Sequence, residues 1–165
     1  MSWRKFEFGA PELAALGTAR LTGRIAYLAT IRADGAPRVH PVSPFISHVT
    51  LFVYMEPTSP KGNDLRRDSR YAMHCSVEDT SGGGGEFCVR GRAAMVDDPQ
   101  TRGEAFDAAT SIGYKPNDRY TLFELNVEEA LATTYDNGLP VRRRWRASRP
   151  RCASPLKKSR LRCTR

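Results

Sequence analysis

The sequence has 165 residues, of which 40% are hydrophobic. This is enough apolar material for one domain with a buried core, which excludes a wholly disordered chain. No apolar run approaches the ~20 residues that span a bilayer, and no secretory signal is visible, so neither a membrane protein nor a secreted protein is expected.

The net charge of +8 comes from the C-terminal end of the chain. Residues 142–165 contain 11 of the 26 Lys and Arg residues and no Asp or Glu, whereas residues 1–141 hold the other 15 and all 18 acidic residues, a net charge of −3. A basic tail attracts phosphate groups only loosely. We therefore expect a domain over residues 1–146 and a basic, disordered tail over 147–165, with nucleic-acid binding no more than a weak property of that tail.

The four cysteines, Cys75, Cys88, Cys152 and Cys163, form no C-x-x-C pair and have no histidine at zinc-ligand spacing. A metal site is therefore not expected. Because no secretory signal is visible, we interpret the cysteines as reduced thiols of a cytoplasmic protein.

The N-terminal part predicts one helix and a β-hairpin. Residues 10–20 are rich in Ala and Leu and are typical of a helix. The apolar segments 23–31 and 38–43 predict two strands, because Asp34-Gly35 between them favours a tight turn.

The middle of the chain predicts a strand, a short helix and another strand. Residues 49–55 are rich in Val, Leu, Phe and Tyr, which favour a strand. Residues 59–68 predict a helix with Ser59 as its N-cap and Pro60 at its first position. Residues 71–77 predict the next strand.

The remaining elements complete a mainly β pattern. Residues 86–96 predict a strand in which Gly91 marks a bulge, and residues 97–110 predict a helix. Further strands are expected over 120–127, 130–135 and 139–145. Six or seven strands with few helices indicate an antiparallel barrel or sandwich.

The start of the helix at 59–68 is the first candidate site. A helix N-terminus presents free backbone N–H groups and the positive end of the helix dipole, so it attracts anions. Lys61 adds a cation there, which is unfavourable beside the dipole unless an anion lies opposite. The alternative is an ordinary solvated lysine, and these residues alone do not separate the two interpretations.

The strand over 38–43 is the second candidate site. Alternation places Arg38, His40 and Val42 on one face. The other face carries Val39, Pro41 and Ser43. Pro41 lacks an N–H, so the strand is expected to be interrupted or to lie at an edge. Arg38 and His40 could donate to a phosphate or a polar ring; the alternatives are a solvent-facing strand and a buried His40.

Other catalytic motifs are missing from the sequence. The four glycines at 82–85 lack the order of a phosphate-binding loop and predict a flexible connection. Neither H-E-x-x-H nor G-x-S-x-G is present, so the sequence does not support a hydrolase.

Three stretches, 25–39, 52–72 and 86–93, resemble in order and spacing the pyridoxamine 5′-phosphate oxidase-like flavin-binding proteins of split-barrel fold. The resemblance covers about half of the domain. It implies a mainly β domain built as an antiparallel split β-barrel of six to seven strands, the FMN-binding split barrel.

The resemblance also implies a cofactor site, although no catalytic residue. In this family the strand after the first hairpin contacts FMN, with its arginine at the phosphate, a role that falls on Arg38. The end of the third strand, here Tyr54 and Met55, also contacts the cofactor. The family's phosphate-binding S-R-K segment falls on residues 59–61, with proline replacing arginine, and its flavin-facing glutamine falls at Glu86. The implied cofactor-binding residues are Arg38, Val39, His40, Pro41, Val42, Ser43, Tyr54, Met55, Ser59, Pro60, Lys61 and Glu86.

The resemblance implies a flavin-dependent oxidoreductase that binds FMN at a homodimer interface and reduces or oxidises a small molecule. The R-L-H-x-R segment near the C-terminus of the true oxidase has no counterpart here, so a short relative is implied. The deazaflavin coenzyme F-420 is an alternative cofactor on the same fold, because its longer acidic tail would suit Lys61, Arg66 and Arg67.

A non-catalytic module is a further alternative. It would bind flavin, or would bind haem through His40, His48 or His74, and would show cofactor binding without turnover.

Overall fold

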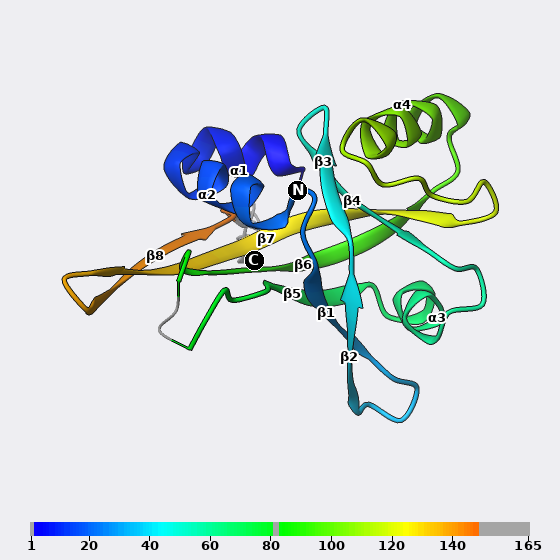
Figure 1. Ribbon diagram of the computed structural model, residues 1–165. Helices are drawn as coiled ribbons and strands as arrows, with labels where there is room; N and C mark the ends of the chain where they lie inside the picture. The colour runs from blue at the N-terminus through cyan, green and yellow to red at the C-terminus, as the bar shows by residue number, and fades with distance from the viewer. Residues whose placement is uncertain (1, 81–82, 149–165) are drawn as a thin grey trace, which may run out of the picture.

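The computed structural model describes residues 2–80 and 83–148 (Figure 1). The predicted basic tail beyond Ser148 lies outside the described residues, as does part of the glycine-rich connection. Within the described residues, no helix combines the length and the apolar character needed to cross a membrane.

The described chain forms four helices and one eight-stranded antiparallel sheet, so the prediction of a mainly β, antiparallel fold is confirmed. The helices are α1 (Trp3–Gly9), α2 (Pro11–Leu21), α3 (Pro60–Arg67) and α4 (Pro99–Ser111). The strands are β1 (Ala26–Ile31), β2 (Pro37–Val42), β3 (Pro44–Ser47), β4 (Thr50–Met55), β5 (Arg70–Cys75), β6 (Glu86–Val96), β7 (Thr121–Asp136) and β8 (Leu139–Arg146). Their order is β2-β1-β5-β6-β7-β4-β3, and β8 pairs with β7.

The four helices lie at three places around the sheet (Figure 1). α1 and α2 lie against the long β7 and β8, and α4 lies beside β3 and β4. α3 contacts β1 and β6. α3 follows β4 after a short connection, and its contact with β1 places it beside the first hairpin.

The strand predicted over 38–43 is β2, and it is followed by a further strand, β3, that the sequence did not predict. Ser43 separates β2 from β3, and β3 pairs only with β4 among the described strands. Pro44, which begins β3, has no N–H to continue the ladder of β2. The interruption expected near the prolines is therefore confirmed.

The prediction of separate strands over 120–127 and 130–135 is wrong, because β7 runs through both segments. Gly91 pairs with Val127, whereas Arg90 pairs with Glu129, so Glu128 is the extra residue of a bulge. A Cβ atom on Gly91 would lie 1.8 Å from the carbonyl oxygen of Asn126, so only glycine fits. The bulge predicted at Gly91 is confirmed, and it keeps β7 continuous.

Helix α1 is a feature that the sequence did not predict. Trp3 and Phe6, three positions apart, are fully buried and meet edge-to-face with their ring centroids 5.0 Å apart. Phe6 also packs against Trp145 of β8. Long-range aromatic contacts therefore hold a helix of only seven residues.

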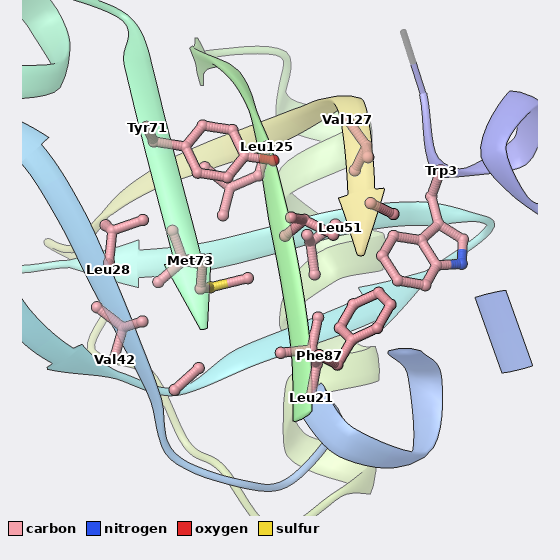
Figure 2. Packing of buried hydrophobic residues seen from close by; sticks show 14 of the residues in the cluster. Trp3, Leu21, Leu28, Val42, Leu51, Tyr71, Met73, Phe87, Leu125 and Val127 are labelled. Atoms are coloured by element: carbon pink, nitrogen blue, oxygen red, sulfur yellow. The ribbon is translucent and has the colours of Figure 1, made fainter. Parts of the chain in front are cut away.

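The core has two parts. The larger cluster fills the space inside the sheet beneath α1 and α2; Figure 2 labels ten of its members, among them Leu28, Met73 and Phe87. The smaller cluster lies under α4 and contains Phe45, Tyr54 and Leu122.

Candidate functional site

The N-terminus of α3 forms as the sequence predicts. The Oγ of Ser59 accepts a hydrogen bond from the backbone N–H of Gly62 at 3.2 Å, and Pro60 occupies the first helical position. A Cβ atom on residue 62 would lie 2.9 Å from that hydroxyl oxygen, so glycine keeps the cap open. Pro60 has no N–H, and Gly62 and Asn63 donate theirs to Ser59, so the first turn offers an anion the N–H of Lys61 and the positive end of the helix dipole.

Lys61 lies in that first turn and is half-buried. Burial lowers the pKa of its ammonium group. Within the part of the chain that the structure describes, Lys61 has no ion-pair partner. A partly desolvated cation without a carboxylate, placed where the helix dipole is also positive, favours an anionic ligand.

Arg38 reaches α3 from β2. Its Nε donates to Oδ2 of Asp64 at 2.7 Å, and the Oγ1 of Thr30 donates to the same oxygen at 2.9 Å. The contact uses only the Nε edge of Arg38, which leaves the two terminal amino groups available to a ligand. Asp64 follows Lys61 by three positions, so both lie on one side of α3, the side that Arg38 contacts.

Asp64 is a residue that the sequence analysis missed. Its side chain is 4% exposed and is held by Arg38, Thr30 and Arg67. Burial opposes its ionisation, but the hydrogen bonds from these three residues outweigh burial and hold its pKa below the usual range. A single acid inside a basic helical segment was the available signal, although its partner lies 26 positions away.

Alternation along β2 is confirmed. Arg38 and His40 are half-buried and Val42 is buried, whereas Val39 and Pro41 are exposed. Arg38 and His40 therefore lie on the inner face of the sheet, and the outer face carries Val39 and Pro41. Ser43 is half-buried at the break that follows.

The side chains of Tyr54 and Met55 pack in different parts of the domain. The ring of Tyr54 stacks on Phe45, with centroids 5.7 Å apart, and lines a cavity of about 200 Å³ beneath α4. Met55 belongs to the main core, and its sulfur lies 3.8 Å from the Cβ position of Gly62 in α3. Of these two predicted cofactor residues, the structure brings only Met55 to α3.

Glu86 begins β6 and pairs with Thr133. It lies five positions before Gly91, which is about 17 Å along an extended strand, and Gly91 pairs with Tyr71 near the α3 end of the sheet. Within one chain, the structure does not bring Glu86 to Arg38 and Lys61.

The three histidines lie apart from one another on different elements. His40 is on β2, His48 is in the turn after β3, and His74 is on β5, where its Nδ1 lies 2.6 Å from the carbonyl oxygen of Cys75. In residues 2–80 and 83–148, no group of three or more His, Cys, Asp or Glu side chains could hold a metal ion.

Comparison with known proteins identifies the fold. A family model described as pyridoxamine 5′-phosphate oxidase matches residues 13–134. A NimC/NimA family protein from Clostridium acetobutylicum is 17% identical, with a TM-score of 0.62 over 85% of this chain and 94% of that one. No curated protein matches the sequence.

Two further solved structures share the fold. A heme-binding protein from Mycobacterium smegmatis is 16% identical, with a TM-score of 0.59 over 78% of this chain and 55% of that one. An F-420 reductase is 18% identical, with a TM-score of 0.53 over 67% of this chain and 91% of that one. The mainly β fold implied by the resemblance, the split barrel, is therefore confirmed.

Proposed function

Because the chain belongs to the pyridoxamine 5′-phosphate oxidase family, we propose that it binds FMN through Arg38 and Lys61 and acts as an oxidoreductase on a small molecule. The observation that carries the proposal is the unpaired, half-buried Lys61 at the N-terminus of α3, on the side of the helix that Arg38 contacts.

The residues present suit the phosphate group of FMN. Arg38, Arg67 and Asp64 together carry a net charge of +1, and Lys61 raises it to +2, which matches a phosphate dianion. Asp64 fixes the guanidinium of Arg38 through Nε, so that little conformational entropy is lost when a phosphate binds. The proline in place of the family's arginine removes one side-chain contact, and the N-terminus of α3 supplies the backbone N–H of Lys61 and the positive end of the helix dipole instead.

Bound FMN would supply the redox chemistry itself. The chain's own residues would hold and orient it: Lys61 and Arg38 at the phosphate, and the β2 residues that follow Arg38 along the ring. Glu86 of the same chain lies too far along β6 to join them, so it is not among the residues proposed to hold the cofactor.

A homodimer forms part of the proposal because the outer face of β1 and β2 is apolar. Tyr27 pairs with Pro41 on one side and with His74 on the other, and Ala29 pairs with Val39. Tyr27 is 47% exposed and Val39 is 61% exposed. Apolar side chains gathered on one sheet face favour burial against a second copy.

Sedimentation equilibrium tests the dimer. Val39→Glu should shift the wild-type dimer to a monomer, because a charge would be buried in the contact. Phe8→Glu, at a position that is 92% exposed on α1, is the matched control and should leave the dimer intact. A wild-type monomer, or dissociation by both variants, would contradict the proposed interface.

F-420 is the second candidate cofactor, and an F-420 reductase shares the fold. The contacts of the two arginines weaken this candidate. Arg66 donates to the carbonyl oxygen of Pro57, to Asn63 and to Thr121. Arg67 donates to the carbonyl oxygen of Ile31 and to Asp64. Arg66 is engaged through both of its terminal amino groups, whereas Arg67 uses only one. The loss of Arg66 as a partner for a longer acidic tail makes FMN the preferred cofactor.

Mass spectrometry of the small molecule released on denaturation tests the choice, together with the absorption spectrum of the purified protein. The proposal predicts flavin bands and the mass of FMN. A deazaflavin mass would favour F-420, and a haem spectrum would favour the non-catalytic binding module. A protein that carries no cofactor and does not bind added FMN would contradict the proposal.

The cysteines support a cytoplasmic location, which is also part of the proposal. Cys75 and Cys88 are free thiols on neighbouring strands. Free thiols are typical of a reducing compartment.

A further inference from the structure

A cavity of about 610 Å³ opens on the outer face of the sheet, where β7 bulges. Because Glu128 is the extra residue of the bulge, Glu128 and Glu129 both line the cavity although they are consecutive. The chain after β8 closes one side, where the N–H of Ala147 donates to the carbonyl oxygen of Glu128 at 2.9 Å. The size is typical of small-molecule sites.

Positive charge dominates the lining of this cavity. Its charged side chains are four arginines, Arg70, Arg90, Arg92 and Arg146, and two glutamates, Glu128 and Glu129, a net charge of +2. Arg70 and Arg92 stand directly opposite each other in the β5–β6 register. Like charges in such a pair destabilise a sheet unless a counter-charge lies between them.

The carboxylates nearby are already engaged. Glu129 accepts from Arg146 at 3.0 Å and also pairs with Arg144. Burial raises the pKa of Glu129, but the hydrogen bonds from the two arginines outweigh burial and hold the pKa below the usual range. Glu128 lies 3.5 Å from Arg92, and Asp68 binds Arg70. These contacts leave the lining with excess positive charge.

Arg90 supplies that excess. Among the residues that the structure describes it has no ion-pair partner, and its side chain is exposed. Glu129 stands opposite Arg90 in the β6–β7 register, but its carboxylate is held by Arg144 and Arg146. Arg90 also interacts with the thiol of Cys88: burial raises the pKa of this thiol, and Arg90 partly offsets the increase. A neutral thiol does not balance a guanidinium charge.

We propose that this cavity is a second anion site, which binds a small molecule carrying a phosphate or carboxylate group through Arg90, with Arg70 and Arg92 beside it. Guanidinium groups bind both kinds of oxyanion in a bidentate manner. Nearby Glu128 can accept a hydrogen bond from a hydroxyl or amino group of the same ligand.

The site is separate from the proposed cofactor site. Ala29 of β1 pairs with Val39 of β2 on one side and with Ala72 of β5 on the other, and Ala72 pairs with Arg90 of β6. These four residues therefore share the outer face. Arg38 precedes Val39 and therefore lies on the other face. A ligand in the cavity and a phosphate at Lys61 would occupy opposite faces of the sheet.

Isothermal titration of the full-length protein with inorganic pyrophosphate and with malonate tests the proposal and distinguishes the two oxyanions. Arg90→Ala should lower the affinity for whichever probe binds more tightly by about tenfold or more. The control is Arg142→Ala, an exposed arginine of β8 outside the cavity, which should change the affinity less than about twofold. Arg90→Lys retains the charge, and the melting temperature of each variant reports whether it folds.

Three results would overturn the proposal: no saturable binding of either probe, unchanged affinity in Arg90→Ala, or equal losses in Arg90→Ala and Arg142→Ala. Lys61→Ala separates the two sites. If Lys61→Ala abolishes the binding of the probe and Arg90→Ala does not, the anion occupies the cofactor site and the second site is wrong.

Discussion

The Nε of Arg38 donates to Oδ2 of Asp64 over 2.7 Å, and this contact joins β2 to α3. Because Asp64 is buried and also held by Thr30 and Arg67, the position of Arg38 is fixed before any ligand binds. The proposed phosphate site therefore depends on a carboxylate that does not touch the ligand.

Asp64→Asn should lower the free energy of unfolding by about 1–3 kcal/mol at pH 7, because Arg38 loses a charged partner in a buried contact. The pKa of Asp64 is held below the usual range in the folded state, so its contribution is present above the unfolded pKa of ~3.9 and disappears as the pH falls through the folded value. Urea unfolding from pH 7 to pH 3 should show the wild type and the variant converging in acid.

Asp107→Asn is the control for this change. Asp107 is exposed on α4 and forms no ion pair with the other described residues, so its loss should alter stability little at any pH. Equal effects of the two substitutions would contradict the role assigned to Asp64.

Lys61 should make FMN binding depend on pH. Burial lowers the pKa of its ammonium group, so the group loses its proton below the ~10.4 of an ordinary lysine. The affinity for FMN should therefore fall as the pH rises toward that range. Lys61→Arg keeps its charge and should bind with little change over the same range, as fluorescence titration would show. A parallel decline in both proteins would mean that Lys61 is not the titrating group.

Phe6→Ala should lower the free energy of unfolding by about 3–5 kcal/mol, because the ring is fully buried between Trp3 and Trp145. Phe8→Ala changes the same residue type on the same helix, at a position that is 92% exposed, and should cost less than about 0.5 kcal/mol. Thermal and urea unfolding measure both variants. Similar losses would mean that α1 does not pack as described.

Gly91→Ala should destabilise the domain by about 2–4 kcal/mol, because a Cβ atom would lie 1.8 Å from the carbonyl oxygen of Asn126 and would displace the backbone of β7. Gly103→Ala is the matched control in α4, where no heavy atom lies within 4 Å of the added Cβ. That variant should gain up to about 1 kcal/mol from helix propensity. A neutral Gly91→Ala would contradict the bulge.

The sequence predicted those features that depend only on residues close together in the chain. The cap at Ser59 and Pro60, the bulge at Gly91 and the alternation along β2 all match the structure. Each depends on backbone chemistry that a single residue type reveals, such as a missing N–H or a missing Cβ.

Features that depend on distant contacts were not predictable in the same way. Helix α1 is too short to show a period, and the partners of Phe6, Phe87 and Trp145, are far away in the sequence. The buried role of Asp64 depends on Thr30, which lies 34 positions earlier. The separation of Tyr54 from Met55 follows from the alternation of side chains along β4. The family resemblance, in contrast, implied that both residues contact the cofactor.

Titration with FMN tests the central claim most directly. The wild type should bind FMN saturably, and Lys61→Ala and Arg38→Ala should each weaken binding about 10- to 100-fold, the effect expected for one charged hydrogen bond to phosphate. Lys115→Ala, an exposed lysine after α4, should bind like the wild type. Unchanged FMN affinity in both Lys61→Ala and Arg38→Ala would contradict the phosphate site at α3.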